Sequence, residues 1–249
     1  MIYAIIAGCC VILTSVFGSV LGLIFRKITH RINDMFLGFA AGVMMAAAFL
    51  GLLPTAFSQS EFSAISVAVF GIIAGAVFIS LLDRFIPHIH IDGGQMREES
   101  SPNPRANRTL LLVIAIAIHN IPEGLATGIV FGKGVSGNAL MVAASMMIQK
   151  IPEGLIVMIP LLRMGMSKTR ALLFSFGVAL MMLPGVVIGA ILGSLPVMLE
   201  ILFYGFTFGA IIYVVSDEII PESHEHGYQR YATFALIVGI ITVAMLQYI

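Results

Sequence analysis

The 249-residue sequence has few charged residues and few cysteines. Only 10% of the residues are charged, whereas a soluble domain carries about a quarter. The two cysteines, Cys9 and Cys10, are adjacent, so they form neither a disulfide framework nor a C-x-x-C pair. The net charge is zero, so we expect no nucleic-acid partner. Hydrophobic residues make up 59% of the chain, which indicates a protein that crosses a membrane several times.

The sequence also lacks two catalytic motifs. It contains no G-x-x-x-x-G-K-[ST] segment, which argues against ATP-driven pumping. It contains no H-E-x-x-H segment, which weakens the alternative of an intramembrane metalloenzyme. We therefore predict a protein that is not an enzyme and has no cofactor.

Eight apolar runs are long enough to cross a bilayer, which takes roughly 20 helical residues. They cover about 2–25, 34–57, 62–86, 109–132, 138–162, 170–194, 197–220 and 230–249. We predict an all-α integral membrane protein with eight transmembrane helices in one polytopic domain, residues 1–249. A polar loop at 87–108, rich in Pro, Gly, Ser and Asn, separates three helices (2–86) from five (109–249).

The basic residues divide unequally between the two sides of the membrane. Eleven lie in the connections after the first, third, fifth and seventh predicted helices, whereas Lys133 is alone on the other side. Because Lys and Arg accumulate in cytoplasmic loops, we predict that both termini lie outside. The 87–108 loop is then cytoplasmic, and we expect the plasma (inner) membrane.

One short motif occurs twice, in the middle of the fourth and fifth predicted helices, as 119-HNIPEG-124 and 149-QKIPEG-154. His119 and Glu123 are spaced i, i+4, as are Gln149 and Glu153, so each pair shares one helix face. An imidazole, two carboxylates and an amide oxygen suit a borderline divalent metal such as Zn²⁺. A buried carboxylate is costly unless it is paired or binds a cation. We therefore favour a mid-membrane metal site over plain hydrogen bonding between helices.

Each motif contains a proline, Pro122 or Pro152. Proline lacks an amide hydrogen, so it frees the carbonyl four residues earlier. We predict that both prolines open or kink the helix beside the ligands. The glycine that ends each motif allows close helix approach.

Two further polar clusters are candidate metal sites. The inner end of the seventh predicted helix carries the possible exit ligands Asp217, Glu218, Glu222 and His224. The alternative is an ordinary solvated helix end. The polar loop carries an H-x-H-x-D group, His88, His90 and Asp92, which is a possible loop metal site.

The two motifs, the eight apolar runs and the loop after the third resemble the ZIP (Zrt/Irt-like) family of divalent metal transporters, and its GufA-like branch in particular. The likeness extends to 38-GFAAGVMMAAAFLGLLP-54 and 209-GAIIYVVSDEIIPESHEHG-227. The resemblance implies a ZIP-like bundle that imports Zn²⁺ or related ions by an elevator-like movement. It also implies a metal site of His119, Glu123, Gln149 and Glu153 between the fourth and fifth helices, with Asn120 as a second-site ligand.

Three positions depart from the family pattern: Lys150 and Leu183 stand where second-site ligands are expected, and Thr55 where an acidic residue is common. A charged lysine cannot bind a metal. We therefore predict a mononuclear site in which Lys150 bridges Glu123 and Glu153, with Asn120 and Lys150 as the remnant of a second site. One lysine against two glutamates leaves a single negative charge, which should weaken binding and ease release.

Other functions stay open at this point. A channel-like pore for the same ions is one alternative, and a sensor or a carrier with altered substrate is another. The ligand set also suits Cd²⁺, Fe²⁺ and Mn²⁺. The expected partners are the divalent ion as substrate, the lipid bilayer and a second copy of the chain in a homodimer.

Overall fold

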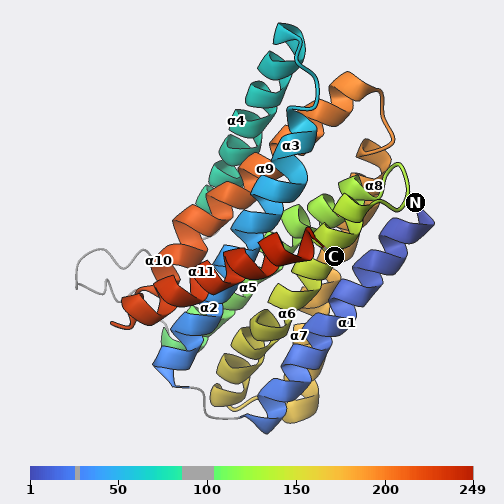
Figure 1. Cartoon of the computed structure of the whole chain (residues 1–249). Helices are drawn as coiled ribbons and strands as arrows, with labels where there is room; N and C mark the ends of the chain where they lie inside the picture. Colours follow the sequence, from blue (N-terminus) through green and yellow to red (C-terminus); the bar gives the residue numbers. More distant parts are fainter. Residues whose placement is uncertain (26–28, 86–103, 249) are drawn as a thin grey trace.

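The computed structural model describes residues 1–25, 29–85 and 104–248, and this part of the chain is helical without strands (Figure 1). Its elements are α1 (Ile2–Ile24), α2 (His30–Ala47), η1 (Ala48–Leu52), α3 (Leu53–Ala56), α4 (Phe62–Phe85), α5 (Pro104–Val130), α6 (Gly137–Arg163), α7 (Lys168–Leu180), α8 (Met182–Leu192), α9 (Val197–Val214), η2 (Val215–Ile219), α10 (Ile220–Ser223) and α11 (Gln229–Leu246). The predicted loop site of His88, His90 and Asp92 lies outside the described residues.

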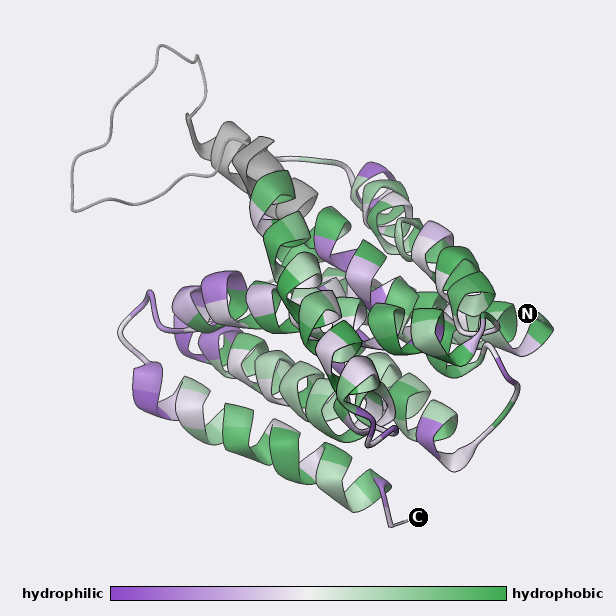
Figure 2. Cartoon of the chain, turned by 90° about the horizontal axis from the view of Figure 1, so that it is seen from above, coloured by the Kyte–Doolittle hydropathy of each residue, from purple (hydrophilic) through white to green (hydrophobic). Residues whose placement is uncertain are grey.

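Seven helical stretches of the described chain are long and apolar enough to cross a membrane. They are Ile2–Ile24, His30–Ala56, Phe62–Leu82, Gly137–Arg163, Lys168–Leu192, Val197–Ser223 and Gln229–Leu246. The 27-residue α5 packs among them, chiefly against α8. Large apolar side chains such as Phe70 and Phe234 are exposed on the outside, and Figure 2 shows α11 hydrophobic along most of its length. The predicted all-α membrane class is confirmed.

Two of the stretches contain a π-helical turn directly before a proline. At the end of η1 and of η2, the amides of Leu53 and Ile220 bond to carbonyls five residues earlier. Pro54 and Pro221 follow, and neither can donate a hydrogen bond. By contrast, α5 and α6 stay α-helical through the prolines of the repeated motif. The changes of helical register thus lie before Pro54 and Pro221, and the opening or kinking of the helix at Pro122 and Pro152 stays a prediction.

The helices pack as two groups. In the first group, α1 lies along α6 and α5 lies along α8, with α7 beside them. In the second group, α4 lies along α9 and α2 lies along α11. This group includes η1 and α3, which continue α2, and η2 and α10, which continue α9. The groups meet mainly where α2 contacts α6 and where α5 contacts α9. Both repeated motifs belong to the first group.

The glycines of the repeated motifs fix how α5 and α6 pack. A methyl group at Gly124 would collide with the carbonyl oxygen of Met182 in α8. One at Gly154 would collide with the carbonyl oxygen of Ser15 in α1. Each motif therefore packs one face tightly on a neighbour of its own group, as small residues in membrane helices permit.

Candidate metal site

The two motifs meet between α5 and α6 through Glu123 and Gln149. The side-chain amide of Gln149 donates to Glu123 Oε1 at 2.7 Å, and both residues are buried. Gln149 Oε1 is also buried but has no hydrogen-bond partner among the described residues. An unsatisfied buried acceptor costs about 1–3 kcal/mol, so this oxygen would gain from a cation.

Lys150 is the centre of the polar cluster. Its side chain and that of Glu123 are each only 2% exposed. The Lys150 ammonium forms ion pairs with Glu123 and Glu153, at 2.6 Å from each Glu153 oxygen, and donates to Asn120 Oδ1. An ammonium has three protons to donate, and here its hydrogen bonds go to Asn120 Oδ1 and to both Glu153 oxygens. Lys150 thus bridges the two motif carboxylates.

Asn120 connects this cluster to α7. While its oxygen accepts from Lys150, its amide group donates to the carbonyl of Val178 at 2.8 Å. Leu183, the other departure from the family pattern, packs against the hydrophobic core. Neither of the two expected second-site positions, Lys150 and Leu183, supplies an oxygen ligand.

His119 contacts a residue that the sequence placed elsewhere. Its Nε2 lies 2.6 Å from Glu218 Oε2 in η2, which belongs to the second helix group. Glu218, which the sequence indicates as a possible exit ligand, thus contacts the first motif directly. The π-helical turn that carries Glu218 could not be read from helical periodicity, which assumes 3.6 residues per turn.

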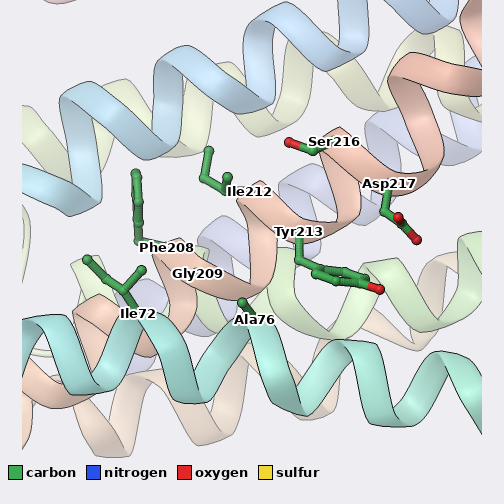
Figure 3. A pocket seen from close by; sticks show the side chains of 8 residues that line it. All are labelled: Ile72, Ala76, Phe208, Gly209, Ile212, Tyr213, Ser216 and Asp217. Atoms are coloured by element: carbon green, nitrogen blue, oxygen red, sulfur yellow. The ribbon is translucent and has the colours of Figure 1, made fainter.

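Asp217 lies apart from this cluster. It is at one end of a pocket of about 350 Å³ between α4 and the α9–η2 segment (Figure 3). The pocket is lined by Ile72, Ala76, Phe208, Gly209, Ile212, Tyr213, Ser216 and Asp217. None of the four predicted metal ligands lines it. The adjacent carboxylates of Asp217 and Glu218 in η2 therefore lie in different environments: Asp217 lines the pocket, whereas Glu218 contacts His119.

The remaining exit residues lie near the end of α10. His224 Nδ1 is 2.7 Å from the carbonyl of Ile220, and its Nε2 is 3.3 Å from Thr233 Oγ1, so both ring nitrogens have local partners. Glu222 is half-buried in α10.

Asp34 is a further buried acidic residue that no sequence motif indicated. Its Oδ1 lies 2.9 Å from His226 Nδ1. His226 in turn stacks on His30. The i, i+4 spacing of His30 and Asp34 was the available signal.

Within the described ranges, no three His, Cys, Asp or Glu side chains stand together in a geometry that could hold a metal ion. Instead, His119 pairs with Glu218, and Glu123 and Glu153 pair with Lys150. The structure brings the motif residues into one polar cluster whose charges are partly neutralised by lysine.

Comparison with known proteins identifies relatives over nearly the whole chain. A family model described as "ZIP Zinc transporter" matches residues 1–104 and 90–247. The zinc transporter ZIPB of Bordetella bronchiseptica is 34% identical, over 98% of this chain and 80% of its own. The zinc transporter GufA of Myxococcus xanthus is 37% identical over 71% and 68%, and the zinc transporter ZIP11 of Homo sapiens is 30% identical over 92% of both chains.

Proposed function

The chain belongs to the ZIP family of zinc transporters, and from this premise we propose that it carries Zn²⁺ into the cytoplasm one ion at a time. The family is one of multi-pass membrane transporters and not of enzymes, and zinc is its substrate. In our proposal the ion is bound by His119, Glu123, Gln149 and Glu153. The basic residues support an orientation with both termini outside.

The position of Lys150 supports a single ion most directly. Its ammonium lies between Glu123 and Glu153, where it pairs with both carboxylates. A second divalent ion there would need further oxygen ligands and would be repelled by the lysine charge. Asn120, the remaining second-site residue, already accepts a hydrogen bond from Lys150.

The charge of the cluster supports a divalent substrate. Glu123 and Glu153 with Lys150 would leave one net negative charge, as the sequence suggested. Glu218 adds a third carboxylate through its contact with His119, so the cluster carries two negative charges when His119 is neutral. One divalent ion would then neutralise it, and a neutral cluster is the least costly to hold inside a membrane.

Two protein groups would compete with the metal in this scheme. Zn²⁺ would displace the Lys150 ammonium from the two carboxylates, and it would take His119 from Glu218. Gln149 Oε1, which has no hydrogen-bond partner in the part of the chain that the structure describes, could join the ion. Such competition weakens binding and assists release.

The arrangement of the two groups supports an elevator-like movement. The four proposed ligands lie in α5 and α6 of the first group, whereas Glu218 lies in η2 of the second. Sliding of the first group against the second would separate His119 from Glu218. Metal binding at His119 and movement of its group would therefore be linked.

Uptake into proteoliposomes tests the transport proposal. We expect saturable uptake of Zn²⁺, with Cd²⁺, Mn²⁺ and Fe²⁺ compared at equal concentrations. Glu123→Gln should abolish uptake, whereas Glu61→Gln, an exposed acidic residue outside the cluster, should leave it unchanged. Non-saturating flux would favour a channel-like pore. Well-folded protein without any uptake would indicate a sensor or another substrate.

The number of zinc ions bound per chain tests the proposal that the site holds a single ion. We expect equilibrium dialysis to give one Zn²⁺ per wild-type chain and up to two for Lys150→Asp, which replaces the ammonium with a ligand. Two ions bound at this cluster in the wild type would contradict the mononuclear proposal.

A further inference from the structure

A second ion pair connects the two helix groups at the end that holds the α5–α6 and α8–α9 connections. Lys133 follows α5, and its ammonium pairs with Glu200 in the first turn of α9. The side chain of Glu200 is only 10% exposed, whereas that of Lys133 is 62% exposed. A carboxylate so deeply buried is costly without its partner, so the contact favours the packed arrangement.

Two neutral contacts accompany this pair. One helical turn further along α9, the Tyr204 hydroxyl donates to the carbonyl of Ile129 in α5 at 3.3 Å. Asn138, at the start of α6, donates to the carbonyl of Gly51 in η1 at 2.9 Å. Each contact joins the first helix group to the second. Sliding of the groups would have to break them.

The distribution of basic residues in the sequence indicates on which side of the membrane this end lies. Lys133 is the one basic residue in the connections that the charge distribution assigns to the outside. The end held by the Lys133–Glu200 pair is therefore the outer end in the proposed orientation. Because Lys133 is accessible to water, the pair can open without a buried lysine being left behind.

We propose that the Lys133–Glu200 ion pair, called here the outer ion pair, holds the outer end of the transporter closed and so sets how often the metal site opens outward. Glu200 and Lys133 are thus positioning residues that act through the contact between α5 and α9. This inference rests on the proposed transport function. The inference goes beyond transport because it assigns a gating role to residues outside the metal cluster.

Cysteine accessibility measures outer opening directly. Val142 in α6 is fully buried and lies against Gly51 in η1, across the boundary between the groups. We would introduce Val142→Cys after replacing Cys9 and Cys10 by alanine. A membrane-impermeant maleimide added outside then labels the new cysteine only when the outer end opens.

The expected results use two independent ways to break the pair. Glu200→Gln and Lys133→Met should each raise the labelling rate about tenfold, which is the effect of about 1.4 kcal/mol on an equilibrium. The double variant should be no faster than either single one, because both remove the same interaction. Glu61→Gln removes an exposed acidic charge elsewhere and should change nothing.

Two results would overturn the outer ion pair as a gate. One is labelling at the wild-type rate in both single variants, and the other is additive effects in the double variant. Lys133→Met alters an exposed side chain, so it remains informative if Glu200→Gln fails to fold. Zinc uptake by proteoliposomes that contain the same variants separates the gating proposal from the transport proposal. Uptake without a labelling effect contradicts only the gate, and a labelling effect without uptake contradicts only the transport function.

Discussion

Replacing Lys150 by methionine isolates the role of the bridging charge. Methionine keeps a long apolar side chain but leaves Glu123 and Glu153 without their counter-charge. Removing one partner of a buried ion pair costs about 3–5 kcal/mol. Since the Glu153 side chain is 17% exposed and partly solvated, we expect the lower end of this range. Without metal, Lys150→Met should therefore be destabilised by about 3 kcal/mol.

Zinc should reverse this loss, because a divalent ion can take the place of the ammonium. If the ion recovers about 3 kcal/mol, its affinity for Lys150→Met exceeds that for the wild type by about 100-fold. Tighter binding should also slow release. We therefore expect both the KM and the maximal rate of uptake to fall.

Thermal unfolding of the purified protein, with free zinc set by a chelator, measures both effects. The wild type and Lys168→Met, which changes an exposed lysine at the start of α7, are the controls. The reasoning is refuted if Lys150→Met is as stable as the wild type without metal. It is equally refuted if zinc stabilises the two proteins to the same extent.

Two further predictions concern the helix contacts around the cluster. Glu218→Gln frees His119 from its competing carboxylate, but it also removes one of the three negative charges that attract the ion. Because that charge acts on a doubly charged ion, its loss should dominate and weaken zinc binding about tenfold by calorimetry. Asp217→Asn is its control, because Asp217 lies in the separate pocket; equal weakening by both changes would argue against a role for the His119 contact. Gly154→Ala forces a methyl group against α1 and should lower stability by about 1–3 kcal/mol. Gly177→Ala, where no atom of the described residues lies within 4 Å of the added methyl group, should not lower stability. Equal unfolding temperatures for the two variants would contradict the packing argument.

Local patterns were sufficient to predict the membrane class and the positions of the motif residues. The length and composition of an apolar run decide whether it can cross a bilayer, and helix geometry places residues at i, i+4 on one face. The pairing of Lys150 with Glu153 was also predictable, because the two lie at i, i+3 in α6. Each of these properties depends on residues close together in the sequence.

Other features depended on how distant helix faces pack. The contact of His119 with Glu218 joins α5 to η2, and the outer ion pair joins the end of α5 to α9. The two residues of each contact lie far apart in the sequence, so no local pattern indicates that they meet. In addition, the π-helical turn at Val215–Ile219 breaks the 3.6-residue period by which side-chain directions are extrapolated.

The sequence by itself thus determined that the chain is a helical membrane protein with metal-binding residue types and a lysine among them. Only the tertiary structure decided that Glu218 contacts His119 of the first motif and that Glu200 pairs with Lys133. The physical reason is that hydrophobicity and helical period act along the chain, whereas these ion pairs depend on the packing of one helix group against the other.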